Sequence, residues 1–174
     1  MKFTVRECKE NDIEIIADYF ITASTDYLEG MGVDKNKFPK RDEYIVKLQH
    51  ELTKPYSEKE LYYIVWEQNG KAVGHSNVNN IIFGEVATMH LHVWNPQLRQ
   101  NGLGTQFLKK TIPLYFKNLE LKKLICQPYA KNISPNKTLQ KVGFNFVKNY
   151  KTVPGPINFY QEVNLYEIHK NALV

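Results

Sequence analysis

Arg99-Gln100-Asn101-Gly102-Leu103-Gly104-Thr105 is the stretch that decides the fold, because it joins an apolar segment ending near Trp94 to an amphipathic segment beginning near Gln106. A strand, a glycine-bearing loop and a helix in this order predict an anion site. The first backbone N–H groups of a helix have no partner inside it, and the helix dipole adds partial positive charge. Main chain alone can therefore hold a phosphate or pyrophosphate here, and the two glycines permit close approach and positive φ.

This loop has a plain alternative, a tight turn whose glycines serve only the backbone geometry. Spacing excludes two familiar phosphate motifs. No G-x-x-x-x-G-K-[ST] is present, and G-x-G-x-x-G fails because Phe107 stands where the third glycine belongs. The sequence therefore argues against a P-loop nucleoside triphosphatase and a Rossmann dehydrogenase.

Length and composition predict a single domain, residues 1–174. With 43% hydrophobic residues the chain can bury a sizeable core. The longest apolar runs, 64–66 and 81–83, are too short to cross a bilayer, and residues 1–6 lack the apolar core of a signal peptide. We expect a cytoplasmic protein without a membrane partner.

Charge and cysteine content exclude further classes. The net charge is +5, but the lysines are scattered and form no basic run, so we expect no nucleic-acid partner. Two cysteines, Cys8 and Cys126, make neither a disulfide framework nor a metal-ligand cluster, so we expect no metal. Cys126 stands in an apolar segment and is predicted to be a buried apolar residue.

Periodicity and turn signals predict alternating strands and helices. Helical spacing of apolar residues follows Asn11-Asp12 as a cap, and Asn69-Gly70 separates two strands of a hairpin. Pro113 inside a long helical pattern should kink that helix or leave one carbonyl unpaired. The predicted strands are 3–6, 61–66, 72–78, 85–94, 121–127, 144–147 and 163–168, and the predicted helices include 41–52 and 105–119.

A helix that joins two consecutive strands indicates a parallel pair with a right-handed crossover, here around the helix 105–119. The glycine loop then lies at the carboxyl end of a strand. Near the end of the chain, Ser134 is predicted to cap a helix with Pro135 at its first position, and Gly143 to follow its last turn. The fold class expected is α+β, with helix layers on both faces of a mixed sheet.

Three elements now stand in order: the R-x-x-G-x-G loop from Arg99 to Gly104, a parallel strand, and Asn132 followed by Gly143-Phe144. This order resembles the GNAT superfamily of acyl-CoA-dependent N-acetyltransferases, whose pyrophosphate loop carries [QR]-x-x-G-x-[GA] and whose last helix ends in Gly-Phe. The resemblance covers roughly residues 60–170. It implies a mostly antiparallel sheet with one splayed parallel pair and acetyl-CoA as the cofactor.

Residues 132–144 resemble the ribosomal-protein N-acetyltransferase branch. Many members of the superfamily place a tyrosine four residues before the glycine, where it protonates the leaving thiolate, but Leu139 stands there in this chain. The resemblance implies direct acetyl transfer in a ternary complex to a primary amine, either a protein N-terminus or a small molecule such as an aminoglycoside or polyamine. We expect a monomer or homodimer. A non-catalytic acyl-CoA-binding or regulatory module, favoured by Leu139, and an unrelated αβ protein are the rival interpretations.

The resemblance also implies the cofactor contacts. A backbone N–H in the strand where the parallel pair splays is expected to polarise the thioester carbonyl. Asn132 is expected to tie the splayed strands or to bind the pantetheine arm, and its alternative is a turn residue. The cofactor residues predicted are His92, Val93, Trp94, Arg99, Gln100, Asn101, Gly102, Leu103, Gly104, Thr105, Asn132 and Asn136.

Candidate acids and bases come from the strand 85–94 and from the segment beyond the next strand. Thr88, His90 and His92 alternate and so share one face, and an imidazole with its ordinary pKa near ~6.5 can accept a proton at neutral pH. Packed histidines are the alternative. Glu85 is another candidate base, otherwise a solvent-facing turn residue.

Tyr129 and Ser134 are the candidate acids, with a rim aromatic and a helix cap as their alternatives. An acceptor pocket is expected between the segments 27–38 and 154–159, as the resemblance implies. Its predicted aromatic wall, which could equally belong to the core, consists of Tyr27, Phe38, Phe159 and Tyr160.

Overall fold

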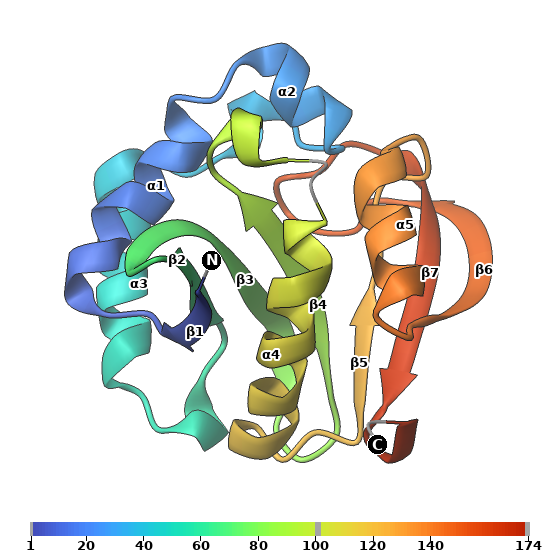
Figure 1. The fold of residues 1–174 in the computed structure, drawn as a ribbon. Helices are drawn as coiled ribbons and strands as arrows, with labels where there is room; N and C mark the ends of the chain where they lie inside the picture. Colours follow the sequence, from blue (N-terminus) through green and yellow to red (C-terminus); the bar gives the residue numbers. More distant parts are fainter. Residues whose placement is uncertain (1, 100–101, 173–174) are drawn as a thin grey trace.

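The computed structural model describes residues 2–99 and 102–172 as a seven-stranded mixed sheet with helices on both faces (Figure 1). The strands are β1 (Phe3–Glu7), β2 (Tyr62–Gln68), β3 (Lys71–Ile82), β4 (Val86–Val93), β5 (Lys123–Cys126), β6 (Asn145–Thr152) and β7 (Gln161–His169). The helices are α1 (Ile13–Ile21), α2 (Thr25–Gly30), α3 (Arg41–Thr53), α4 (Leu103–Asn118) and α5 (Ile133–Lys141). Along the sheet the strand order is β1-β2-β3-β4-β5-β7-β6, and the α+β class is confirmed.

The predicted hairpin is present between β2 and β3. Asn69 has φ 51° and Gly70 has φ 78°, the left-handed pair that matches the twist of a two-residue turn. β3 is longer than predicted, because it continues to Ile82 through an irregularity opposite β4. On its other side β3 pairs with β4, from Gly74 opposite Val93 to Ile82 opposite Val86.

β4 and β5 form the predicted parallel pair, joined by α4. Their registered partners run only from Val86 with Lys123 to Thr88 with Ile125. β4 then continues to Val93 beside β3, whereas β5 ends at Cys126. The two strands have therefore separated at the carboxyl end of β4. The gap between them is called the splay below.

α4 begins at Leu103, earlier than the predicted Thr105, because Gly102 at φ 71° takes the cap position. It continues without interruption through Pro113, whose missing N–H leaves the carbonyl of Lys109 without its donor in the helix. Phe107 on its buried side stacks on Trp66, with ring centroids 5.1 Å apart. This apolar face anchors α4 to the sheet.

α5 differs from the prediction at its start and agrees at its end. Asn132 is the cap residue, so Ser134 lies inside the first turn and the predicted Ser134 cap is wrong. Gly143 follows the last turn with φ 97°, and the Phe144 amide donates to the Leu139 carbonyl at 3.0 Å. That bond closes the helix in the way that a left-handed glycine allows.

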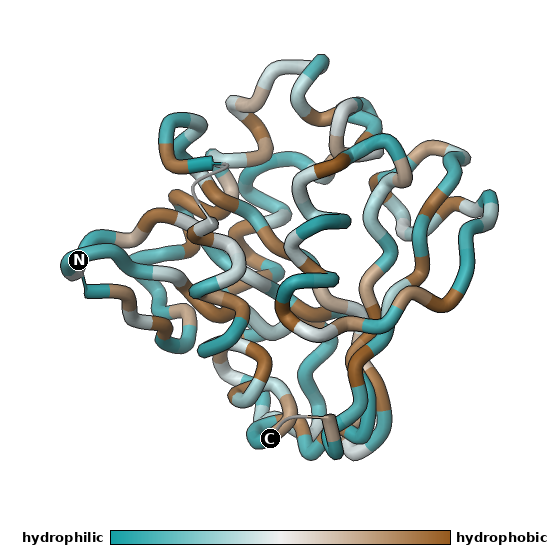
Figure 2. Tube along the Cα trace, turned by 45° about the vertical axis from the view of Figure 1, so that its right-hand side comes forward, coloured by the Kyte–Doolittle hydropathy of each residue, from teal (hydrophilic) through white to brown (hydrophobic). Residues whose placement is uncertain are grey.

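Apolar residues concentrate along the inner strands and the inward sides of the helices, while hydrophilic residues occupy most outer turns (Figure 2). The predicted burial of Cys126 is confirmed, and its thiol donates to the Met89 carbonyl at 3.0 Å. Among the described residues, none of the helices combines the length and apolarity that a bilayer crossing needs.

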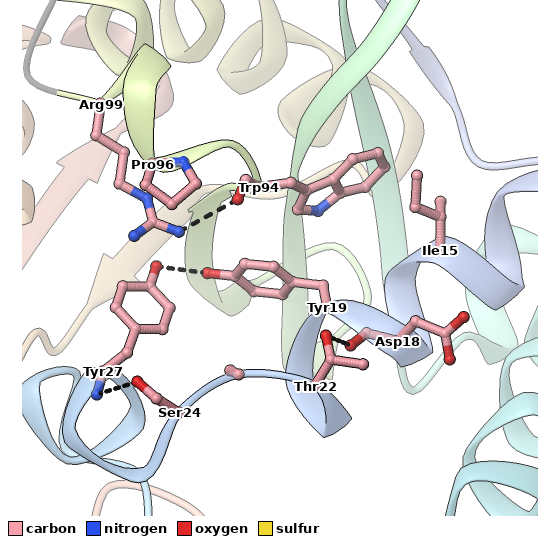
Figure 3. A pocket seen from close by; sticks show the side chains of 10 residues that line it. Ile15, Asp18, Tyr19, Thr22, Ser24, Tyr27, Trp94, Pro96 and Arg99 are labelled. Atoms are coloured by element: carbon pink, nitrogen blue, oxygen red, sulfur yellow. Dashed lines mark hydrogen bonds between the residues drawn. The ribbon is translucent and has the colours of Figure 1, made fainter.

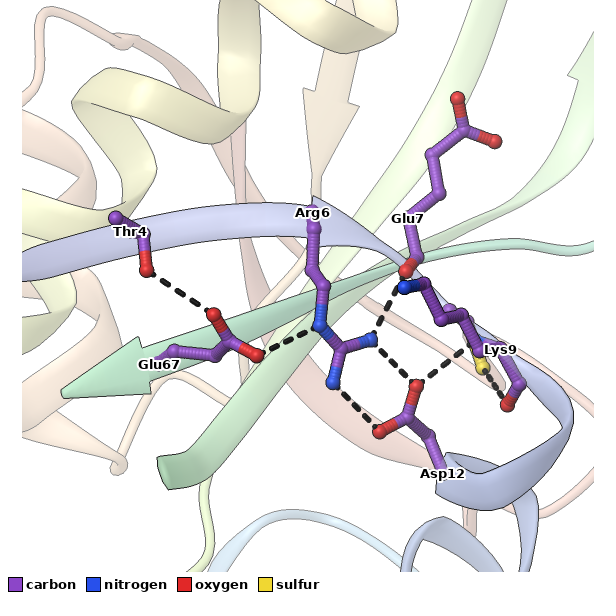
Figure 4. A network of polar contacts seen from close by, with 7 residues as sticks. Thr4, Arg6, Glu7, Lys9, Asp12 and Glu67 are labelled. Atoms are coloured by element: carbon purple, nitrogen blue, oxygen red, sulfur yellow. Dashed lines mark hydrogen bonds and ion pairs between the residues drawn. The ribbon is translucent and has the colours of Figure 1, made fainter. Parts of the chain in front are cut away.

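Arg6 ties β1 to the start of α1 and to β2 (Figure 4). Its guanidinium binds both carboxylate oxygens of Asp12, at 2.6 and 2.9 Å, and its Nε donates to Glu67 at 2.6 Å. Asp12 also accepts from the Lys9 amide at 2.8 Å. The buried network therefore fixes where α1 begins against the sheet.

Candidate active site

One backbone amide of β4 points into the splay. The Trp94 amide donates to the Val73 carbonyl of β3 at 3.0 Å. Since successive residues of a strand direct their amides to opposite edges, the Val93 amide points away from β3 and toward the edge that β5 has left. This is the position predicted for a donor to a thioester carbonyl.

The α4 N-terminus lies beyond this end of β4 and is bare of side chains at two positions. A Cβ at Gly102 would meet nothing within 4 Å, and one at Gly104 would meet Thr138 of α5 at 3.5 Å. An anion can therefore approach the first N–H groups of α4 closely. Gln100 and Asn101, also predicted to bind the cofactor, lie outside the described residues.

Asn136, rather than Asn132, ties the strands beyond the splay. Its Nδ2 donates to the Tyr129 and Asn132 carbonyls at 3.1 and 2.7 Å, and its Oδ1 accepts from Asn164 of β7 at 2.8 Å. The side chain of Asn132 makes no cap hydrogen bond. Asn136 thus joins the turn after β5 and the start of α5 to β7, which is a different tie from the one between β4 and β5 that was expected of Asn132.

The face expected for the histidines is confirmed. Thr88, His90 and His92 lie on the side of the sheet that α1 covers, while Met89 lies in the core beneath α4. His90 Nε2 lies 3.1 Å from Asn79 Oδ1, and burial lowers the pKa of His90 to about 4. Burial and the neighbouring imidazoles likewise lower the pKa of His92, so both rings are neutral at pH 7.

A third histidine, His75 of β3, belongs to the same cluster and was missed by the sequence reasoning. Its ring centroid is 4.8 Å from that of His92, and its Nδ1 accepts from the Trp94 indole at 2.8 Å. Full burial lowers the pKa of His75 to about 3. The pairing of β3 with β4 sets His75 directly opposite His92, and this register is the signal that could have found it.

Two tyrosines connect His92 to the molecular surface. The Tyr19 hydroxyl of α1 lies 3.5 Å from His92 Nδ1 and 2.7 Å from the Tyr27 hydroxyl of α2. Burial, with Tyr27 beside it, raises the pKa of Tyr19, which keeps its hydroxyl protonated. The three groups form a hydrogen-bonded row that leads from the histidine cluster to a pocket.

This pocket, of about 450 Å³, lies between α1, the start of α2 and the turn after β4 (Figure 3). Arg99 closes one end. Its Nε donates to the Val93 carbonyl at 3.0 Å, its Nη2 to the Trp94 carbonyl at 3.3 Å, and its guanidinium lies 4.1 Å from the Tyr27 ring centroid. Arg99, predicted to bind the cofactor, is thus held against Tyr27 and the end of β4.

The two segments expected to build the acceptor pocket are hydrogen-bonded to each other. The Asp34 amide donates to the Ile157 carbonyl at 2.8 Å, and Asn158 and Gln161 both donate to the Gly32 carbonyl, at 2.8 and 2.7 Å. The four side chains predicted to line the acceptor pocket nevertheless do not lie together.

Of the predicted acceptor residues, only Tyr27 lines the pocket. Phe38 stacks on Phe20 in a small core, Phe159 packs edge-on against Tyr129, and Tyr160 is exposed. Trp94 and Tyr19, which the sequence did not assign to the acceptor side, complete the aromatic wall. Their assignment needed the packing of α1 against β4.

Glu85 is removed from the candidate bases. It lies before the start of β4, seven residues from His92, which corresponds to about 23 Å along an extended strand. Its carboxylate forms an exposed ion pair with Lys122 at 2.6 Å. The alternative, a solvent-facing turn residue, describes it correctly.

Comparison with known proteins identifies the domain type. A family model described as an acetyltransferase (GNAT) domain matches residues 2–145. No curated protein matches the sequence significantly.

Solved structures share the fold at low identity. A spermidine N-acetyltransferase from Vibrio cholerae, in complex with CoA and spermine, has a TM-score of 0.79 and 14% identity, with 98% of this chain and 97% of that chain covered. A ribosomal-protein-S5-alanine acetyltransferase from Vibrio fischeri has a TM-score of 0.79 and 18% identity, with 100% and 96% covered. An aminoglycoside acetyltransferase in complex with coenzyme A and kanamycin has a TM-score of 0.73 and 15% identity, with 98% and 96% covered.

Proposed function

The chain belongs to the GNAT acetyltransferase family, and on that premise we propose that it moves an acetyl group from acetyl-CoA directly to a primary amine. The observation that carries the proposal is the splay, where β4 and β5 have separated and the bare N-terminus of α4 stands beside the free edge of β4. Family membership favours an enzyme over a module that only binds acyl-CoA.

The donor site follows from residues that fit a coenzyme A. Gly102 and Gly104 leave the first N–H groups of α4 open to a pyrophosphate, and the splay gives the pantetheine arm a path along β4. The spermidine and aminoglycoside acetyltransferases were both solved with coenzyme A, which supports the same ligand here. When bound, acetyl-CoA supplies a thioester, an activated acyl group that an amine can attack.

In the proposed reaction the protein stabilises negative charge on the thioester oxygen and accepts a proton from the amine. The Val93 amide donates to the carbonyl oxygen as negative charge develops there, an interaction worth about 10²-fold in rate when such a donor is well placed. His92 is the proposed base: burial keeps its ring neutral, but the lowered pKa makes it a weak base, so it would take the amine proton, directly or through water, only in passing. Tyr19, hydrogen-bonded to Tyr27, can pass that proton toward the surface.

The thiolate leaving group needs a proton from another source, because Leu139 is fully buried in the core and carries no proton to give. Tyr129, in the turn after β5, and Ser134, in the first turn of α5, remain the proposed acids, with solvent as their alternative. The acceptor classes named for the neighbours are polyamines, aminoglycosides and ribosomal protein, and all of them present an amine.

Acetyl-CoA binding tests the proposal first. At ligand concentrations about 100-fold above Kd, binding should stabilise the protein by about 2.7 kcal/mol and raise its Tm. Gly104→Val should abolish this rise, because it adds a branched side chain to the first turn of α4, where the pyrophosphate is proposed to bind. Gly104→Ala, whose Cβ meets Thr138 at an ordinary 3.5 Å, is the matched control for folding.

Release of free thiol across a panel of primary amines then tests transfer. Turnover that depends on both substrates supports the proposal. No Tm shift at millimolar acetyl-CoA, or an unchanged shift in Gly104→Val, would contradict the assignment of the loop.

A further inference from the structure

The pocket in Figure 3 has a positively charged side chain, Arg99, at one end. A pocket for a positively charged acceptor amine would be expected to carry carboxylates instead. Arg99 is half-buried, and in the part of the chain that the structure describes it forms no ion pair with a carboxylate. Among the described residues, the Val93 and Trp94 carbonyls accept from two of the five N–H groups of its guanidinium. Arg99 therefore has donors and a full charge to offer to a ligand.

The one carboxylate that lines the pocket does not balance this charge. Asp18 accepts from Arg41 Nε at 2.7 Å, and in Figure 3 it points away from Arg99. Its charge is thus already paired outside the pocket. A polycationic acceptor entering here would meet a fixed positive charge without a free negative one, which costs affinity.

The remaining wall suits an apolar body. Tyr19, Tyr27 and Trp94 present aromatic rings, and Ile15 and Pro96 add aliphatic surface. A volume of about 450 Å³ is within the range of small-molecule sites and accommodates a body of amino-acid size. The hydroxyls of Thr22 and Ser24 are engaged with the backbone of α1 and α2.

The anion site lies close to the proposed reaction centre. Val93 supplies both the amide proposed to polarise the thioester and the carbonyl that holds Arg99 Nε. An anionic group bound to Arg99 is therefore only a short distance from the reacting nitrogen. A single guanidinium matches one negative charge, and its planar fork matches a carboxylate.

Resting on the proposed function, we infer that the acceptor is a small amino acid-like molecule: a primary amine with a nearby carboxylate, which Arg99 binds, and an aromatic or apolar body, which the tyrosine and tryptophan rings enclose.

Matched acceptors test this inference. Phenylalanine and phenethylamine differ only in the carboxylate. Phenylalaninamide replaces the carboxylate by an amide, and a Phe-Gly dipeptide moves it one residue further from the amine. With acetyl-CoA present, kcat/KM for phenylalanine should exceed that for each of the other three at least tenfold, as one charge-assisted pair allows. Binding of the same four ligands to the protein saturated with CoA, measured by calorimetry, should follow the same order.

In Arg99→Gln the ratio of kcat/KM for phenylalanine to that for phenethylamine should fall from tenfold to about one. The main cause should be a higher KM for phenylalanine. Lys122→Gln removes an equal charge at the far end of the sheet and should keep the preference. If Arg99→Gln changes the KM of acetyl-CoA and leaves the acceptor preference intact, Arg99 serves the pyrophosphate and the inference is wrong.

Other outcomes separate the inference from the function it rests on. Equal use of phenethylamine, preferred use of the dipeptide, or turnover of spermidine or kanamycin alone would overturn the acceptor class and leave acetyl transfer standing. Failure to bind acetyl-CoA at all would overturn both.

Discussion

The two faces of the sheet bury different chemistry. Beneath α4 the core is built from apolar side chains such as Phe107 and Met89, and the Trp66 indole there is satisfied by Thr111 at 2.9 Å. Beneath α1 the sheet presents imidazoles and phenols, with His75 and His92 at its centre. Apolar burial holds the fold on the first face, whereas polar groups on the second face are available for chemistry at a cost in stability.

Removing one aromatic ring from each face is the strongest test of this difference between the two faces. Phe107→Ala should lower the free energy of unfolding by about 3–5 kcal/mol, because the ring is fully buried and stacks on Trp66. Phe38→Ala, half-buried in the cluster beside α1, is the matched variant and should lose clearly less. Urea unfolding measures both, and equal losses would show that the two faces do not differ in this way.

The histidines predict a pH dependence confined to the second face. Burial lowers the pKa of His75 to about 3, whereas the unfolded chain takes up the proton near ~6.5. Its stabilising contribution is therefore complete above that value and is lost as the pH falls toward 3. Between pH 7 and pH 5 this amounts to about 2 kcal/mol.

His75→Asn tests that prediction, because an Asn oxygen can accept from the Trp94 indole but does not titrate. The variant should lose about 2 kcal/mol less than the wild type between pH 7 and pH 5 in urea unfolding. Parallel curves for the two proteins would mean that His75 is not the group responsible.

The smallest effect is expected where α1 is attached. Burial of Asp12 would raise its pKa, but the hydrogen bonds from Arg6 and the Lys9 amide lower it further than burial raises it. Asp12→Asn should therefore cost about 1–2 kcal/mol at pH 7, as a charged hydrogen bond does. The carboxylate's contribution is present above its ordinary pKa and is lost as the pH falls through its lowered pKa, so wild type and variant should converge in strong acid. A constant difference across this range would contradict the assigned role of the charge.

Much of the fold could be predicted from local signals. The Asn69-Gly70 turn, the Gly143 helix end and the parallel pair around α4 depend on backbone φ and on the spacing of apolar residues. Errors arose where several local signals compete. Ser134 with Pro135 makes a plausible helix start, but Asn132 takes the cap position two residues earlier.

The candidate site could be predicted only in part. Alternation along β4 correctly placed His90 and His92 on one face, and the same alternation could not show that Glu85 lies at the far end of the strand from the splay. His75 was missed because its partner His92 is brought beside it by strand pairing rather than by sequence spacing. Arg99 was predicted from its motif, but the direction of its side chain depends on Tyr27 of α2.

By itself the sequence determined the glycine cap of α4, the strands on either side of this helix and the order of the elements, since these follow from properties of neighbouring residues. Only the tertiary structure decided that Tyr19, Trp94 and Arg99 enclose one pocket, and that Arg99 turns its charge into it. These side chains come from α1 and from the turn after β4, and they meet only because both pack against the same end of the sheet. Long-range packing, not local propensity, therefore sets the acceptor chemistry that we propose.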